Sequence, residues 1–125
     1  MKKIISTEKA PAAIGPYSQA VEAAGLLFIS GQLPIDPATG SMAPAEIKAQ
    51  TEAVIKNLEN ILASQGLALE NILKTTVYMA DLSQFAQMNE VYARFFAKNP
   101  PARATVEVKA LPKAALVEIE AVAAR

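Results

Sequence analysis

The spacing of hydrophobic positions along the chain predicts two amphipathic helices. From about residue 45 to residue 65, apolar side chains recur every three or four positions, while charged side chains occupy the opposite side. Gly66 follows directly and suits the C-terminal end of this helix. A second apolar stripe begins after Ser83, a suitable N-cap, and ends before Asn99-Pro100-Pro101. The stripes consist of Ile47, Val54, Leu58, Ile61 and Leu62, and of Phe85, Met88, Tyr92, Phe95 and Phe96.

The other segments have the alternation or the β-branched composition of strands. Ala24-Gly25 predicts a hairpin turn, and the threonine-rich segment 72–80 predicts a central strand. The resulting order, ββ-α-β-α-ββ, predicts an α+β two-layer sandwich with both helices on one face of a mixed six-stranded sheet. Residues 1–125 contain no repeat or linker, so we expect one domain. The expected strands are 2–6, 17–24, 26–31, 72–80, 103–109 and 116–124.

Alternation in the last two strands separates a polar side from an apolar side. We expect the apolar sides beneath the helices, and the polar sides, with Arg103 and Glu118, together on the opposite face of the sheet. That face could simply be solvated. However, segment 26–31 is apolar on both sides, as is 72–80, with Leu73, Val77 and Met79 expected on one side and Ile72 and Tyr78 on the other. A second subunit would cover such a sheet and place Arg103 and Glu118 near a pocket.

Composition removes several kinds of chemistry. The chain has no cysteine and no histidine, which excludes disulfides, thiol nucleophiles, Ser-His pairs and the usual zinc sites. Net charge is zero and the sequence pI is about 6.3, so a dedicated nucleic-acid interface is not expected. No apolar run is long enough for a signal peptide or a membrane span, and we expect a cytoplasmic protein.

Arg103 is the strongest candidate for binding a substrate. Pro100 and Pro101 stiffen the approach to its strand, and a guanidinium at a rigid position suits a bidentate grip on a planar carboxylate. The alternative is a structural arginine that forms an ion pair with Glu107 or Glu118.

Several motifs give the chain a clear resemblance to a known family. The C-terminal motif comprises Pro101-Ala102-Arg103-Ala104-Thr105-Val106-Glu107-Val108, Leu111-Pro112 and Leu116-Val117-Glu118-Ile119-Glu120. The others are Ile14-Gly15-Pro16-Tyr17-Ser18-Gln19-Ala20, Ile29-Ser30-Gly31-Gln32-Leu33-Pro34, Lys74-Thr75-Thr76-Val77-Tyr78-Met79 with Asp81-Leu82, and Asn89-Glu90-Val91-Tyr92-Ala93-Arg94-Phe95-Phe96. In this order they resemble the RidA (YjgF) family of reactive-intermediate deaminases almost from end to end.

The resemblance implies a chorismate-mutase-like fold and a homotrimer with clefts between subunits. It also implies a hydrolase acting on C=N bonds, which converts 2-iminobutanoate and 2-iminopropanoate to 2-oxo acids and ammonia. Such imines derive from 2-aminoacrylate and related enamines released by dehydratases of serine and threonine, the latter in isoleucine biosynthesis. No metal and no organic cofactor is implied.

The resemblance also implies roles for individual residues. Arg103 matches the carboxylate-binding arginine, and Glu118 matches the glutamate that positions water. Tyr17 would close the pocket or donate to the substrate. Pocket positions, whether contributed by side chain or backbone, fall on Ser30, Gly31, Asn89 and Thr105. Many family members have cysteine where this chain has Thr105; the backbone N–H is kept, so we expect activity to persist.

Other interpretations stay open at this point. Glu120 lies on the same side as Glu118 and could be the working carboxylate. Tyr17, Ser30 and Asn89 could have packing or turn roles only. The chain could also be a non-catalytic trimer that binds small carboxylates as a regulator. Less favoured are an RNA-directed ribonuclease or translation inhibitor, and a chorismate-mutase-type isomerase.

Overall fold

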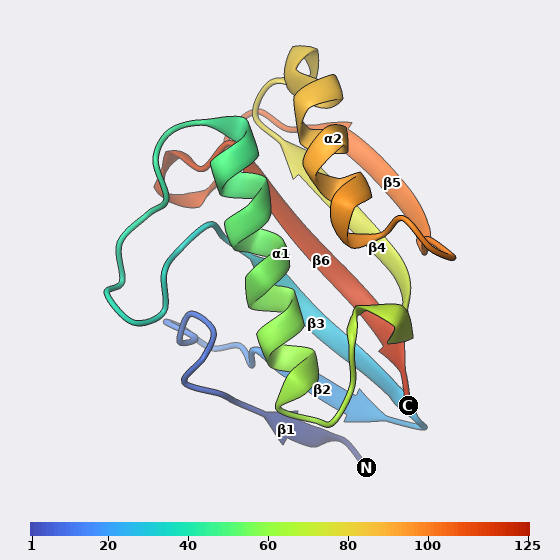
Figure 1. Ribbon diagram of the computed structural model, residues 1–125. Coiled ribbons are helices and arrows are strands. Elements are labelled where there is room, and N and C mark those ends of the chain that lie inside the picture. The colour runs from blue at the N-terminus through green and yellow to red at the C-terminus, as the bar shows by residue number, and fades with distance from the viewer.

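Six strands form one mixed sheet, in the order β1-β2-β3-β6-β4-β5, in the computed structural model, which describes residues 1–125. Strands β4 and β5 are parallel, and the other neighbours are antiparallel. Both helices cover one face, as Figure 1 shows, which confirms the predicted two-layer α+β fold. The elements are β1 Lys3–Ile5, β2 Ala20–Ala23, β3 Leu26–Gln32, α1 Ile47–Ala63, β4 Ile72–Met79, α2 Phe85–Phe95, β5 Ala102–Glu107 and β6 Val117–Ala124.

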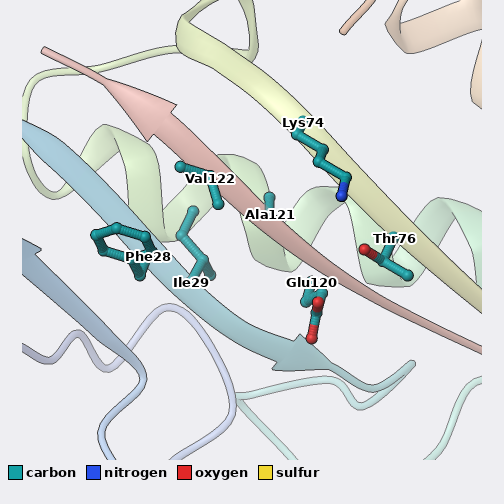
Figure 2. Close-up of a pocket in the computed structure, with 7 residues that line it drawn as sticks. All are labelled: Phe28, Ile29, Lys74, Thr76, Glu120, Ala121 and Val122. Carbon is teal, nitrogen blue, oxygen red and sulfur yellow. The ribbon is translucent and has the colours of Figure 1, made fainter. Parts of the chain in front are cut away.

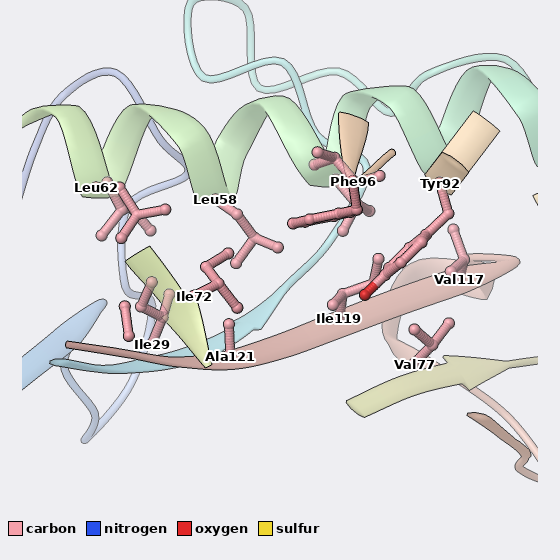
Figure 3. Close-up of a cluster of buried hydrophobic side chains, with 14 of the residues drawn as sticks. Ile29, Leu58, Leu62, Ile72, Val77, Tyr92, Phe96, Val117, Ile119 and Ala121 are labelled. Carbon is pink, nitrogen blue, oxygen red and sulfur yellow. The ribbon is translucent and has the colours of Figure 1, made fainter. Parts of the chain in front are cut away.

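The hydrophobic core lies between the helices and the sheet. Leu58 and Leu62 of α1 lie above Ile29 of β3, Ile72 of β4 and Ala121 of the central strand β6, as Figure 3 shows, and Ile119 of β6 belongs to the same core. Leu58, Leu62 and Ile119 are completely buried. Burying one such side chain contributes about 1.5–3 kcal/mol, so this layer is the main source of the stability of the fold.

Gly66 follows the C-terminal end of α1, and Asp81 caps the short 3-10 turn that precedes α2. Gly66 has φ of 71°, and the Leu67 N–H donates to the Leu62 carbonyl (2.9 Å), which confirms that Gly66 closes the turn at the C-terminal end of α1, just beyond Ala63. Ser83 is not the N-cap of α2, so that prediction was wrong. Asp81 accepts a bond from the Ser83 N–H (2.9 Å) and caps a 3-10 turn at residues 82–84, and α2 begins only at Phe85.

A bulge at the start of β4 reverses two predicted orientations. The pairing of β4 with β6 shifts by one residue between Ile72 and Lys74. Ile72 consequently lies in the core at 4% exposure, whereas Leu73 is 52% exposed on the open face. The predicted faces for this pair were wrong because an extra residue in one strand breaks the two-residue period. From Thr75 to Met79 the alternation is regular, and Thr75, Val77 and Met79 are buried.

Strand β5 turns its polar side toward α2, the reverse of the prediction. Arg103 hydrogen-bonds to Asn89 of α2, and Glu107 accepts a bond from the Leu82 N–H (2.8 Å) just before that helix. Val106, on the apolar side, is 41% exposed on the open face. Alternation separates the two sides of a strand but does not say which one lies beneath a helix. Here the helix offers polar partners, and they decide the orientation.

The face of the sheet without helices carries apolar side chains, as the two-sided apolar pattern of segments 26–31 and 72–80 predicted, although Val106 was expected beneath the helices. Phe28, Leu73 and Val106 are all more than 40% exposed there. A single chain therefore leaves uncovered a surface of the kind that usually packs against another layer.

Candidate functional site

The Arg103 guanidinium lies in a cradle built by helix α2. Its Nη1 donates to Asn89 Oδ1 (2.8 Å), and its Cζ lies 4.7 Å from the ring centre of Tyr92 and 5.5 Å from that of Phe85. Phe85, Asn89 and Tyr92 follow one another at intervals of four and three residues, so they share one side of α2. The helix thus presents two aromatic faces and one amide oxygen to a single cation.

No carboxylate neutralises Arg103. The two salt bridges of the chain join Lys48 to Glu90 and Arg125 to Glu22. Glu107, one proposed structural partner, bonds instead to the backbone before α2. Asn89 is the only hydrogen-bond partner of the guanidinium, which leaves Nε and Nη2 as a free, planar pair of donors. Such a group is suited to bidentate binding of a carboxylate.

A second group of predicted site residues surrounds an irregularity in β3. Pairing of β3 with β6 shifts between Ile29 and Gln32, so that three steps along β3 correspond to two along β6. Ser30 and Gly31 form this bulge, and bulges of this kind commonly redirect side chains beside active sites. A methyl group added to Gly31 would lie 2.8 Å from Cδ of Glu118. The absence of a side chain at Gly31 therefore makes room for the Glu118 carboxyl group.

Tyr17 and Ser30 lie beside this bulge. The Ser30 hydroxyl donates to the Ser18 carbonyl (2.6 Å), and the Ser30 N–H donates to the Gln19 carbonyl (2.9 Å), which ties the bulge to the segment that follows Tyr17. Tyr17 is 53% exposed and lines a small cavity of about 50 Å³ together with Gly31. Tyr17, Ser30, Gly31 and Glu118 thus form one cluster, which we call the glutamate group.

Glu118 has a perturbed acidity. Partial burial raises the pKa of Glu118, and the charge of nearby Glu120 raises it further. Glu120 points into a separate open cavity of about 220 Å³ on the helix-free face, which Lys74 and Thr76 also line (Figure 2). Burial and the charge of Glu120 also raise the pKa of Tyr78 on the same face.

The predicted site residues therefore fall into two groups on opposite faces of the sheet. Arg103, Asn89 and Thr105 form the arginine group, on the helix side of β5 and α2. Glu118 lies on β6, two strands away, and alternates with the buried Val117 and Ile119, so it points to the open face. The expectation that Arg103 and Glu118 share one face was wrong within a single chain. It depended on the orientation of β5, which α2 reverses.

Thr105 has an unusual environment in the arginine group. Its Oγ1 is buried and has no hydrogen-bond partner. It faces the helix side together with Arg103, since Thr105 is level with the buried Val77 of β4. A buried hydroxyl without a partner is uncommon and costs stability.

Sequence patterns did not reveal the contribution of Tyr92 and Phe85. Both were assigned to the hydrophobic stripe of the second helix, and Tyr92 is indeed 5% exposed within the core. The available signal was the i, i+4, i+7 spacing of Phe85, Asn89 and Tyr92, together with an arginine on a neighbouring strand. Elsewhere, no cluster of acidic side chains has the arrangement of a metal site. None of the helices is long and apolar enough to cross a membrane.

Comparison with known proteins gives consistent matches along the chain. The sequence model of the family described as endoribonuclease L-PSP matches residues 7–125. A RutC family protein of Pyrococcus horikoshii is 53% identical over 98% of both chains. A mouse protein named 2-iminobutanoate/2-iminopropanoate deaminase is 46% identical over 98% of this chain and 91% of its own. Among solved structures, E. coli TdcF with bound serine has a TM-score of 0.94 at 44% identity, with 98% of each chain covered.

Proposed function

Because this chain belongs to the RidA (YjgF) family, also described as endoribonuclease L-PSP, we propose that it hydrolyses reactive 2-imino acids to 2-oxo acids and ammonia. The proposed substrates are 2-iminobutanoate and 2-iminopropanoate, named for the mouse relative. The observation that carries the proposal is the free guanidinium of Arg103. Held by Asn89 and two aromatic rings and matched by no carboxylate, it suits an anionic substrate.

Arg103 would bind the carboxylate and orient the imine. The carboxylate oxygens would accept from Nε and Nη2, the donors that are free in the structure. Strand β5 is at the edge of the sheet, so part of its backbone faces away from β4, and the Thr105 N–H could add a bond to the same carboxylate. Fixing the carboxylate would place C2 of the imine for attack.

Glu118 would act on the water. A water molecule held by Glu118 within about 3 Å of C2 adds to the protonated imine. The Glu118 carboxylate accepts the proton that the water loses. Protonated Glu118 then gives its proton to the nitrogen of the C2–OH intermediate and takes the hydroxyl proton as the C–N bond breaks and the 2-oxo acid forms. The departing ammonia takes up this last proton and leaves as ammonium, which restores the Glu118 carboxylate. A pKa of Glu118 above the usual glutamate range would help the carboxyl group accept and return this proton.

Tyr17, Ser30 and Gly31 would complete the pocket around the reacting atoms. Tyr17 is exposed and could close over the substrate or donate to it. The Ser30 hydroxyl already donates to the Ser18 carbonyl, so it would act toward the imine nitrogen as an acceptor. The backbone of Gly31 would contact the ligand beside Glu118.

The two groups would meet between subunits. In one chain Arg103 and Glu118 point away from opposite faces of the sheet, so one chain does not bring them to one substrate. We propose a homotrimer in which the arginine group of one copy faces the glutamate group of the next. The exposed apolar side chains Phe28, Leu73 and Val106 support this arrangement, because neighbouring copies would cover them.

A coupled assay on fresh imine tests the proposal. An amino-acid oxidase generates 2-iminobutanoate or 2-iminopropanoate, semicarbazide traps the imine that remains, and the protein is added as wild type or Arg103→Ala. We expect wild type alone to accelerate imine loss. Folded wild type that accelerates neither imine would overturn the proposal.

Binding without turnover is the second candidate, because the relative TdcF is described with bound serine. The same Arg103 would serve such a protein. Glu118→Gln separates the two functions, because it should leave 2-oxobutanoate binding largely intact while it slows hydrolysis. If wild type binds 2-oxobutanoate and has no turnover to lose, the binding function is the correct one.

A further inference from the structure

The ring of Tyr92 lies closer to the Arg103 guanidinium than the ring of Phe85 does. The guanidinium carbon lies 4.7 Å from the ring centre of Tyr92, closer than to Phe85 at 5.5 Å. Asn89 Oδ1 accepts a single hydrogen bond, from Nη1 of Arg103. This bond limits the position of the guanidinium but leaves its plane free to rotate. A flat aromatic face against a flat cation restricts that rotation.

Tyr92 is itself fixed from two further directions. Its hydroxyl shares a 2.7 Å hydrogen bond with Thr75 Oγ1 on β4, and both residues are buried. Its ring packs against Phe96, with ring centres 4.4 Å apart (Figure 3). Burial raises the pKa of Tyr92, so the hydroxyl stays protonated and keeps this bond across the physiological pH range.

The register of the parallel strands explains why these groups meet. Thr75 on β4 is level with Arg103 on β5, and both side chains point to the helix side. Tyr92 lies above both, with its hydroxyl on Thr75 and its ring on Arg103. We propose that Tyr92 is a positioning residue, whose ring, anchored by its bond to Thr75, aligns the Arg103 guanidinium for the substrate carboxylate. This inference rests on the proposed carboxylate-binding role of Arg103.

Two variants of Tyr92 test the two parts of this arrangement. Tyr92→Phe keeps the ring and removes the bond to Thr75, whereas Tyr92→Leu removes the aromatic face as well. We expect Tyr92→Leu to weaken 2-oxobutanoate binding, measured by calorimetry, about 3- to 30-fold, the range of a lost cation–π contact. Tyr92→Phe should retain most of the affinity. In the imine assay the loss should fall mainly on KM.

Val91→Ala is the matched control for lost packing. Val91 is fully buried in the same helix and is neither a hydrogen-bond partner nor an aromatic partner of Arg103. It should lower the melting temperature without changing 2-oxobutanoate affinity. A purely structural role for Tyr92 predicts the same behaviour in Tyr92→Leu, and that result would overturn the inference.

A measurement without ligand separates this inference from the proposed function. The Nε–Hε NMR signal of Arg103 should be sharp and highly ordered in wild type and Val91→Ala, and disordered in folded Tyr92→Leu. An unchanged order parameter in Tyr92→Leu would refute the positioning role. If wild type binds no 2-oxo acid but the order parameter falls in Tyr92→Leu, the positioning role holds and the proposed substrate is wrong.

Discussion

Gly31 and Glu118 approach each other so closely that no side chain fits between them. A methyl group on Gly31 would overlap the Glu118 carboxyl group, with 2.8 Å to its Cδ and less to Oε2. The backbone of Gly31 does not need positive φ, so glycine matters here because it leaves space for the Glu118 carboxyl group in its observed position, not because of its conformation. The β3 bulge and the Glu118 side chain therefore depend on one another.

Gly31→Ala should displace Glu118 and slow imine hydrolysis. A displacement of about 1 Å in a catalytic group can cost about 100-fold in rate, so we expect kcat to fall by at least about tenfold. The measurement is the semicarbazide-coupled assay on purified, folded variants. A double-mutant cycle provides the control: in a Glu118→Ala background, Gly31→Ala should have little further effect. An equal loss in both backgrounds would mean that alanine acts on something other than Glu118.

Mixed oligomers should recover the activity that two inactive variants lack. Arg103→Ala lacks the arginine group and Glu118→Ala lacks the catalytic carboxylate, so each homogeneous protein should be inactive. After joint unfolding and refolding in equal amounts, about a quarter of sites between random neighbours would combine an intact Arg103 with an intact Glu118. Activity near this fraction of wild type is the expected outcome. No recovery, with mixed oligomers shown by native mass spectrometry, would argue against sites shared between subunits.

Glu120→Gln should shift the acid limb of the pH–rate profile to lower pH. The Glu120 charge helps to raise the pKa of Glu118, so its removal should let Glu118 ionise at lower pH. The profile of kcat against pH would show this, with the uncatalysed imine loss subtracted at each pH. If Glu120 were the working carboxylate, Glu120→Gln would instead abolish turnover and Glu118→Gln would spare it.

The raised pKa of Glu118 also makes the stability of the fold depend on pH. Because the pKa of Glu118 is raised in the folded chain, its protonated form stabilises the fold, and this contribution is lost as pH rises through the folded pKa. The melting temperature of wild type relative to Glu118→Gln should therefore fall between acidic and neutral pH.

Thr105→Val should stabilise the chain while leaving activity nearly unchanged. The Thr105 hydroxyl is buried without a partner, and replacing it with a methyl group removes a desolvation cost of about 1 kcal/mol or more. The proposed ligand contact uses the backbone N–H, which valine keeps. Urea unfolding measures the change. Thr75→Val is the matched comparison and should destabilise, because the Thr75 hydroxyl bonds to Tyr92.

Hydrophobic spacing predicted the order of elements and the two-layer fold, and Gly66 predicted the turn that closes α1, because these depend on local periodicity and on positive φ. It missed the bulges in β3 and β4. A bulge is a register shift between neighbouring strands, and nothing in the segment around Ile72 and Leu73 shows where β6 will pair. One extra residue in β4 at that position was enough to place Ile72 in the core and Leu73 on the exposed face.

The candidate site was predictable by residue but not by arrangement. Motif positions selected Arg103 and Glu118, and alternation placed them on one face because apolar residues were expected beneath the helices. Strand β5 departs from that rule, since Asn89 and the Leu82 N–H offer its polar side better partners than water. Only the packed structure shows that the two charged groups point away from each other.

The polar contacts between β5 and α2 also affect how this part of the chain unfolds locally. Arg103 and Glu107 attach the edge strand to the body and to the start of α2, while the Asp81 cap holds the turn before it. We therefore expect segment 81–107 to open as one cooperative unit, so that its amide protons exchange with solvent together rather than progressively from the sheet edge inward. The carboxylate receptor would then be preorganised before any ligand arrives, and binding would lose little entropy to ordering it.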